Sequence, residues 1–174
     1  DHRIPADRVL GGEAGLGQGF RWALSALELG RINVAARGVG VAQAAFDAAL
    51  AYSQQREAFG RPIAQHQAIG FKLAEMATKL HAARLMVTDA ARRVDAGERA
   101  DMEAGMAKLF ASETAAELAL EAMRIHGGNG FTTEYQVERL YRDAPLMIIG
   151  EGTSEIQKLV ISRTLLARAA ENSL

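Results

Sequence analysis

The chain has 174 residues, of which 49% are apolar and 24% are charged, and its formal net charge is −1. These values indicate one globular domain with a sizeable core, and they give no electrostatic case for binding nucleic acid or an anionic membrane surface. The absence of cysteine excludes a disulfide, a thiolate nucleophile and a cysteine-based metal site, and no apolar run approaches the roughly 20 residues of a membrane span.

The N-terminal third of the chain predicts a short extended segment followed by two helices. Residues 1–12 contain a proline and end in Gly-Gly, which is typical of an extended segment that closes in a turn. A helix is expected over about residues 18–29, where Gly30 breaks the pattern. A second helix is expected over residues 31–56, because apolar residues recur there at steps of three and four: Ile32, Ala35, Val39, Ala42, Phe46 and Ala49.

Two further long helices are predicted by still more regular patterns. One is expected through residues 69–94 and ends at Gly97, and its apolar positions are Ile69, Leu73, Met76, Leu80, Ala83, Val87, Ala90 and Val94. Asp101 is expected to cap the other helix, whose apolar positions are Met102, Met106, Leu109, Ala116, Leu120 and Met123. This helix is expected to stop at the His-Gly-Gly-Asn-Gly stretch of residues 126–130, where glycine readily adopts a positive φ.

Two pairs of residues that fit the S/T-x-x-E/Q capping box predict the last two helices. Thr133 with Gln136 predicts a short helix that Pro145 closes, and Ser154 with Gln157 predicts the start of the final helix. Long, regularly patterned helices joined by short loops indicate an all-α fold. We expect an antiparallel, up-down bundle of the four-helix type with one short extra helix.

A carboxylate stands between two glycines directly ahead of the final helix, in Gly150-Glu151-Gly152. The free N–H groups and partial positive charge of a helix N-terminus suit a group that becomes anionic, and flanking glycines let a ligand approach the backbone. From these residues alone, a capped surface helix with an incidental glutamate is the simpler interpretation. The four histidines form no Glu-x-x-His pair, so the metal site that helical bundles can host is not expected.

Six separate stretches, in register, carry a resemblance to one family. They are residues 28–31 (Glu-Leu-Gly-Arg), 55–62 (Gln-Arg-Glu-Ala-Phe-Gly-Arg-Pro), 66–76, 125–131 (Ile-His-Gly-Gly-Asn-Gly-Phe), 141–144 (Tyr-Arg-Asp-Ala) and 151–157 (Glu-Gly-Thr-Ser-Glu-Ile-Gln). Together the chain resembles the C-terminal helical domain of the FAD-dependent acyl-CoA dehydrogenases. The resemblance implies that residues 1–12 are the end of a middle β-domain and its linker, and that residues 13–174 form the C-terminal bundle. The family's N-terminal helical domain and most of its β-domain would then be absent here.

The family converts an acyl-CoA thioester into its trans-2-enoyl-CoA, and Glu151 matches the carboxylate that removes the α-proton while a hydride leaves to FAD. Burial beneath the acyl chain would raise the pKa of Glu151 by favouring the protonated carboxyl group, whereas the helix N-terminus would lower it by favouring the anion. The sequence leaves open which effect is larger. In the family, the base's own backbone N–H helps to bind the thioester oxygen. Some branches place the base at the position of Gly30, which has no carboxylate, and Glu28 would point to a different helix face.

The resemblance also implies which residues bind the substrate and the cofactor. On the substrate side these are Arg31, Gly150, Gly152 and Arg163, of which Arg31 lies near the base and Arg163 near the CoA nucleotide. Arg31 could instead be a surface cation paired with Asp143. The implied FAD contacts are Arg56, Phe59, His66, Gln67, Arg124, Gly127, Gly128, Thr153 and Glu155. Ordinary surface residues and a plain helix stop are the alternatives for these positions.

Three residues depart from the family's usual pattern. Arg124 stands where many relatives carry glutamine, and an added cation is tolerable near a pyrophosphate. Ala58 replaces a residue that often carries a hydroxyl group. Gly150 replaces the tyrosine that commonly precedes the base, and we expect this loss to leave room for a branched or bulkier acyl group.

Further expectations follow from the resemblance. Because many FAD contacts in the family reach a cofactor held by a neighbouring subunit, a homodimer is implied, or a homotetramer built as a dimer of dimers. The electron acceptor would be an electron-transfer flavoprotein or a similar carrier, and the setting would be fatty acid β-oxidation in the cytoplasm, or in the mitochondrial matrix of a eukaryote. The alternatives are an acyl-CoA oxidase-like flavoenzyme and a non-catalytic helical oligomerisation module. The chain by itself is expected to be inactive, since it cannot enclose a flavin.

Overall fold

The computed structural model describes residues 2–171, apart from the side chain of Glu28. Asp1 and residues 172–174, at the outer ends of the two expected regions, lie outside the described residues. The elements in order are two 3-10 turns (Ala6–Arg8 and Gly12–Gly15), α1 (Gly19–Gln55), strands β1 (Glu57–Ala58) and β2 (Arg61–Pro62), a 3-10 turn (Ile63–Gln65), α2 (Gln67–Asp95), α3 (Asp101–His126), a 3-10 turn (Gly127–Phe131), α4 (Val137–Ile149) and α5 (Ser154–Glu171).

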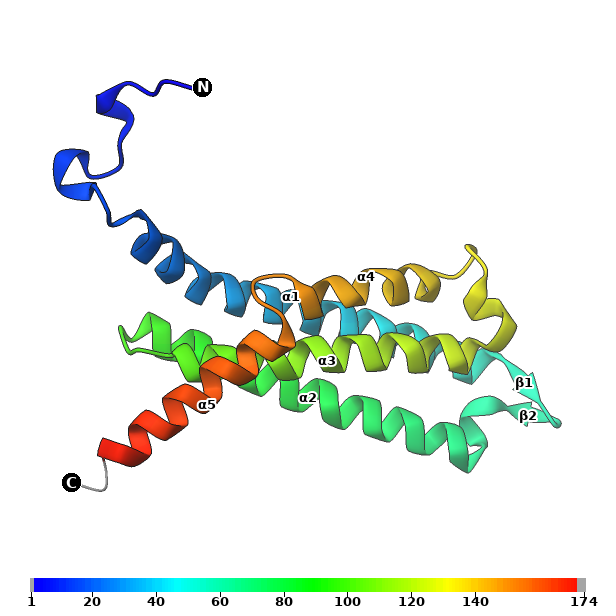
Figure 1. The fold of residues 1–174 in the computed structure, drawn as a ribbon. Coiled ribbons are helices and arrows are strands. Elements are labelled where there is room, and N and C mark those ends of the chain that lie inside the picture. Colours follow the sequence, from blue (N-terminus) through cyan, green and yellow to red (C-terminus); the bar gives the residue numbers. More distant parts are fainter. Residues whose placement is uncertain (1, 172–174) are drawn as a thin grey trace.

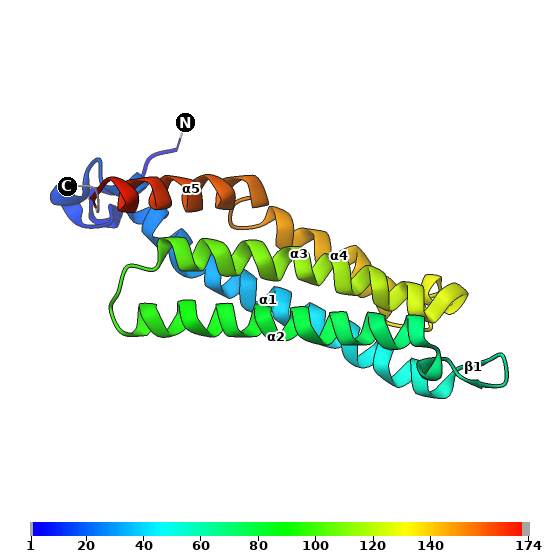
Figure 2. The same cartoon turned by 90° about the horizontal axis from the view of Figure 1, so that it is seen from below.

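The helices form an antiparallel bundle, which confirms the all-α class expected from the sequence. Helices α1, α2 and α3 run side by side, α4 returns along α1 and α3, and α5 continues beside α3 and leaves the bundle at an angle (Figures 1 and 2). Helix α1 spans 37 residues, which corresponds to about 55 Å. The antiparallel hairpin β1–β2, in which Ala58 pairs with Arg61, projects from one end, and the N-terminal segment leaves from the other.

Helix α3 lies at the centre of the bundle and packs against the other four α-helices. It contributes a row of buried alanines to the core: Ala104, Ala107, Ala111, Ala115, Ala119 and Ala122. Small side chains let the neighbouring helices approach closely, and at Gly38 of α1 a Cβ atom would lie only 3.0 Å from the carbonyl oxygen of Ala111. The apolar face predicted for α3 was therefore partly wrong. Leu120 is exposed while Lys108 is fully buried. A central helix has neighbours on several sides, so the spacing of its apolar residues does not define a single buried face.

Two predicted helix breaks are absent. Helix α1 continues through Gly30, since one glycine in a helix costs only about 1 kcal/mol relative to alanine and the packing of a long helix outweighs it. Helix α4 continues four residues past Pro145. The proline removes one backbone hydrogen bond, but Ala144 and Met147 on either side of it are buried and hold the helix in place.

The predicted C-terminal stops are correct, but two predicted caps are not. Gly97, which follows the C-cap of α2, and Gly127, the C-cap of α3, both have positive φ values. Asp101 is the first residue of α3 rather than its cap and forms an ion pair with Arg99. Helix α4 begins only at Val137, without a side-chain cap, so the capping box predicted for Thr133 and Gln136 does not form.

The segment before α1 also differs from the expectation. Between residues 2 and 12 the structure has 3-10 turns and no strand. A strand needs a partner to satisfy its backbone groups, and this segment has none among the described residues.

Residues 2–171 contain neither a membrane-spanning helix nor a cluster of metal ligands. None of these helices is long and apolar enough to cross a membrane. No group of three or more histidine, aspartate or glutamate side chains lies close enough together to hold a metal ion.

We expect Gly38→Ala to lower the free energy of unfolding by about 1–3 kcal/mol, as overpacking of a core does, because the added methyl carbon meets the backbone of α3. Gly40→Ala, in the same helix, is the matched control, since a methyl group there meets no atom within 4 Å. Its better helix propensity should raise the free energy of unfolding by about 0.5–1 kcal/mol. Urea unfolding measures both changes, and equal shifts would contradict the close approach of α1 and α3.

Candidate active site

The turn between α4 and α5 presents Glu151 in an unusual backbone conformation. Its φ is 55°, in the left-handed region, and Phe59 is the one other non-glycine residue within residues 2–171 that shares a positive φ. Such a residue costs about 1–3 kcal/mol and persists only where its surroundings fix it. Gly152, with φ 91°, needs to be glycine for its backbone, whereas Gly150, with φ −66°, does not.

The side chain of Glu151 lies against the backbone of α1 at Gly30. A Cβ atom on Gly30 would lie 2.6 Å from Oε2 and 2.8 Å from Cδ of Glu151, closer than non-bonded atoms can approach. Gly30 therefore provides the space that this carboxylate occupies, at the position where some relatives were expected to carry the base. The side chain of Glu151 is exposed, and its carboxylate has no hydrogen-bond or ion-pair partner among the described residues.

Two backbone donors of the turn are free to bind an oxygen atom, and a cation follows Gly30 in α1. The backbone N–H groups of Glu151 and Gly152 donate to no acceptor within residues 2–171. Arg31, next to Gly30, is half-buried, and its Nε is buried without a hydrogen-bond partner in that part of the chain. It does not form the ion pair with Asp143 that the sequence left open. An unpaired carboxylate beside free donors can remove a proton from a carbon acid whose oxygen becomes anionic.

Two buried polar side chains hold this turn, and the sequence did not predict this role for either of them. Gln157 of α5 is fully buried, and its Nε2 donates to the carbonyl oxygens of Glu151 (3.1 Å) and Gly152 (2.9 Å). Lys108 of α3 is also fully buried, and its Nζ donates to the carbonyl oxygen of Ile148 at 2.8 Å. Burial lowers the pKa of Lys108, and Glu113 and Glu155 oppose that shift. Lys108 is the one charged residue among the small and apolar residues of positions 104–111, and this was the available signal in the sequence.

The start of α5 differs from the predicted capping box. Ser154 is the first helical residue, and its hydroxyl donates to Glu113 at 2.6 Å. Thr153 is the actual cap, because its hydroxyl accepts the amide three residues on at 3.4 Å. Gln157 turns back to carbonyl groups instead of to a helix amide. The carboxylate of Glu155 accepts hydrogen bonds from its own N–H and from the Thr153 hydroxyl, and these hold its pKa below the usual value.

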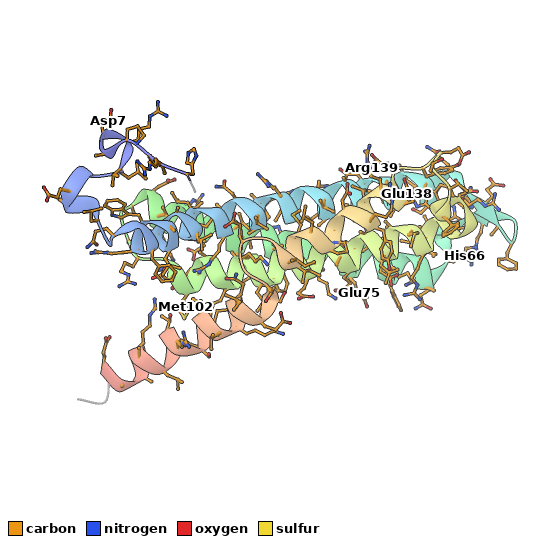
Figure 3. All side chains as sticks on the ribbon, turned by 45° about the horizontal axis from the view of Figure 1, so that its top comes forward. Asp7, His66, Glu75, Met102, Glu138 and Arg139 are labelled. Atoms are coloured by element: carbon orange, nitrogen blue, oxygen red, sulfur yellow. The ribbon has the colours of Figure 1, made fainter. Side chains whose placement is uncertain are left out.

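The remaining candidate binding residues gather mainly around the β1–β2 hairpin, where Figure 3 places His66. His66 donates from Nε2 to the carbonyl oxygen of Ala58 (3.0 Å) and accepts at Nδ1 from Arg61 (3.2 Å), an arrangement that selects its tautomer. Phe59 is 95% exposed at the hairpin tip, and its ring meets that of His66 edge-on at 5.9 Å. His66 thus supports the hairpin, and Phe59 presents a free aromatic face.

A cavity of about 360 Å³ joins the hairpin end of α1 to the glycine loop after α3. Its lining includes Arg56, Gly127 and Gly128, three residues that the resemblance had assigned to one cofactor. Arg56 ends α1 and is exposed, so its guanidinium is available to an anionic group. Gln67, in the first turn of α2, is exposed but is not part of this lining.

His126 forms the base of the glycine loop. Its ring stacks on Tyr52 with ring centres 4.1 Å apart, and its Nδ1 donates to the carbonyl oxygen of Ala122 at 2.8 Å. Burial lowers the pKa of His126, and the hydrogen bond to Ala122 offsets only part of that effect. Asn129 donates to the Tyr52 hydroxyl at 2.9 Å. These contacts fix the loop that carries the two glycines.

Arg124 forms an ion pair on the surface of α3. Its guanidinium binds Glu121, which also accepts from Lys72 of α2. Burial raises the pKa of Glu121, but the two cations outweigh it and the pKa lies below its usual value. The Lys72–Glu121 pair therefore links α2 and α3, whereas Arg124 pairs within α3 and does not line the cavity beside the glycine loop.

The candidate residues of one chain fall into separate places. Gly30, against which Glu151 lies, is 26 residues from Arg56 in the same continuous helix, which is about 40 Å. Arg163 lies in a third place, where it lines a cavity of about 480 Å³ with Arg99, Thr164 and Arg168. Arg168 there pairs with Glu103 of α3. Thr153 and Glu155 are the candidate cofactor residues that lie beside Glu151.

Comparison with known proteins gives consistent matches. A family model described as "Acyl-CoA dehydrogenase, C-terminal domain" matches residues 17–166. The chain is 54% identical over 151 residues to a 3-(aryl)acrylate reductase of Clostridium sporogenes, covering 87% of this chain and 40% of that protein. It is 46% identical over 168 residues to the caffeyl-CoA reductase-Etf complex subunit CarC of Acetobacterium woodii, covering 97% of this chain and 44% of that protein.

A solved structure, that of butyryl-CoA dehydrogenase from Megasphaera elsdenii, superimposes with a TM-score of 0.85 at 43% sequence identity. The match covers 86% of this chain and 39% of that one. The chain thus spans about two fifths of the length of the relatives that it matches.

We expect Gly30→Ala to displace the side chain of Glu151 from α1 by about 1 Å or more, to restore ordinary contact of about 3.5 Å, because the new methyl carbon would otherwise lie 2.6 Å from its carboxylate. The helix itself should remain intact, since alanine favours it. A crystal structure of the variant measures the displacement. An unmoved Glu151 side chain would contradict the contact described above.

Proposed function

This chain belongs to the acyl-CoA dehydrogenase family, whose C-terminal domain it matches, and from that premise we propose that the protein carrying it is an FAD-dependent acyl-CoA dehydrogenase. The observation that supports this most strongly is the unpaired carboxylate of Glu151, held on a left-handed turn against Gly30. In this proposal residues 1–12 lead from a β-domain, and residues 13–174 form the C-terminal helical domain.

Glu151 is the base. It takes a proton from the α-carbon of an acyl-CoA thioester, and the electrons of that C–H bond form the new double bond of the trans-2-enoyl product. Bound FAD would supply the acceptor for the β-hydrogen, which leaves with its electron pair as a hydride. The thioester oxygen gains negative charge as the proton leaves, and the free N–H of Glu151 binds it. Arg31, with its unpaired Nε, provides a nearby cation for the CoA ester.

The cofactor site is shared between subunits in this proposal. Arg56, Phe59, Gly127 and Gly128 have the chemistry to bind a pyrophosphate and an adenine: a free guanidinium, an exposed ring and a loop without side chains. They lie about 40 Å along α1 from the residue that Glu151 contacts. Contacts so far apart on one stiff helix favour a homodimer in which each chain serves two cofactors, with a homotetramer as a dimer of dimers.

The wider setting is proposed from the family. The electron acceptor is an electron-transfer flavoprotein or a similar carrier, which the name of the Acetobacterium woodii relative supports. The reaction belongs to fatty acid β-oxidation in the cytoplasm, or in the mitochondrial matrix of a eukaryote. An acyl-CoA oxidase would use the same base, and measurement of the oxygen reactivity of the reduced enzyme separates the two.

The reverse reaction is the second candidate, because two relatives are named as reductases. Protonated Glu151 would then return a proton to the α-carbon of an enoyl thioester, by microscopic reversibility. The names of these relatives also favour substrates with an aryl group. Gly150 is consistent with such bulk, because it places no side chain directly before the base, and Arg163 and Gly152 complete the proposed substrate contacts.

We expect Glu151→Gln, in the flavin-loaded full-length enzyme, to lower the rate of flavin reduction by acyl-CoA by about 10²–10⁴-fold, the contribution of a general base. Glutamine keeps the shape of the side chain but cannot take the proton. Glu75→Gln on the exposed face of α2 is the matched control and should react at the normal rate. A normal rate for Glu151→Gln would remove the proposal, and a non-catalytic helical module would then be the better account.

We expect Gly150→Tyr to lower kcat/KM for branched or aryl acyl-CoA substrates about tenfold relative to straight-chain ones, a usual effect of filling a pocket. The backbone angles of Gly150 (φ −66°, ψ 150°) are open to any residue, and the added Cβ atom, 3.2 Å from the carbonyl oxygen of Leu146, requires a shift of only a few tenths of an ångström, so the variant should fold. Steady-state rates with both substrate classes give the ratio. An unchanged ratio would show that the space at residue 150 does not set the preference.

A further inference from the structure

The turn that carries Glu151 is held by donors from two different helices. Gln157 of α5 uses both N–H bonds of its carboxamide, on the carbonyl groups of Glu151 and Gly152. Lys108 of α3 binds the carbonyl group of Ile148, in the last turn of α4. Both side chains are fully buried, so neither touches a substrate and neither can exchange its bonds for water.

Gln157 acts on the part of the turn where the backbone is strained. The left-handed conformation of Glu151 is unfavourable for a residue with a Cβ atom and persists only when its neighbours impose it. Bonds to two successive carbonyl groups fix the orientation of both peptide units that follow Glu151. The N–H of Glu151, which belongs to the peptide unit before these two, has no partner among the described residues and is free for a substrate oxygen.

The space around Gln157 is shaped for this side chain. A Cβ atom on Gly152 would lie 2.8 Å from its Nε2, and one on Gly105 of α3 would lie 3.6 Å from its Oε1. Oε1 is buried without a hydrogen-bond partner within the described residues. A buried carboxamide with an unpaired oxygen is costly for stability, and a purely structural position would favour an apolar side chain instead.

Lys108 fixes the other end of the turn. The last carbonyl groups of a helix have no partner within it, and a cation there is favourable. Glu113 and Glu155 lie near enough to act on the charge of Lys108, and Glu113 is in turn held by the hydroxyl of Ser154. The buried lysine thus ties α3 to the end of α4, and Glu113 beside it ties α3 to the start of α5.

We propose that Gln157 is the positioning residue of the site, with Lys108 as its second anchor. Together they hold the turn so that the carboxylate of Glu151 lies on Gly30 and its N–H stays free. This inference rests on the proposed function, in which Glu151 is the base. It predicts that loss of the Gln157 donors slows proton abstraction without weakening the binding of substrate or flavin.

The test is Gln157→Glu in the flavin-loaded full-length enzyme, because glutamate has the same shape and no N–H donors. We expect kcat for flavin reduction to fall about 100-fold, as it does when a catalytic group is misplaced by about 1 Å. The KM for acyl-CoA and the flavin content should stay unchanged, and the isotope effect of α-deuterated substrate should rise. A crystal structure should show residue 151 outside the left-handed region.

Gln157→Met is the second variant, since it removes the donors without adding a charge and also removes the unpaired oxygen. It should fold and lose kcat in the same way, and Lys108→Met should do so to a smaller extent. Gln43→Glu on α1 is the matched control, because it makes the same chemical change 13 residues from Gly30, about 20 Å along the helix. It should keep the normal kcat.

The outcomes distinguish a failure of the positioning role of Gln157 from a failure of the proposed function. If both Gln157 variants fold, bind flavin and keep kcat within twofold of the normal value, the positioning role is overturned. The same holds if they lose flavin but react at the normal rate per bound flavin, which would mark a structural role only. If Glu151→Gln also reacts normally, the proposed function fails instead.

Discussion

The carboxylate of Glu151 can lie on α1 only because residue 30 has no side chain. Because Gly30 lacks a Cβ atom, two segments that are more than a hundred residues apart in the sequence come into contact. This contact sets where the proposed base lies. Most other features of the site follow from that contact. Glu151 adopts a left-handed backbone conformation where its side chain meets α1, and Gly152 lets the chain turn into α5. Buried donors hold this strained backbone in place.

The core, like the site, depends on close contact with a helix backbone. Its helices pack through small residues more than through large apolar side chains. Helix α3 is surrounded on several sides and buries alanine after alanine, with few bulky residues. Dense packing of small residues resists shear between helices, since each backbone contact leaves no room to slide. A stiff frame of this kind suits a site whose geometry depends on a contact between α1 and a turn beyond α4.

The sequence predicted the fold class, the long helices and their C-terminal ends, since hydrophobic periodicity and glycine stops are local signals. It did not predict the continuity of α1 through Gly30 or of α4 through Pro145, because tertiary packing outweighs the local preference at both residues. Of the candidate site, the sequence identified Glu151 and its glycines through the family resemblance. Lys108 and Gln157 were missed as anchors because their roles depend on bonds between helices, which no spacing within one helix reveals.

The left-handed conformation of Glu151 has a consequence for how such a sequence can change over time. Glycine at position 151 would relieve the backbone, and asparagine would fit it better than glutamate does. Selection for stability alone would therefore favour glycine or asparagine at this position. The role proposed for Glu151 as the catalytic base accounts for a glutamate at this position despite its cost to stability.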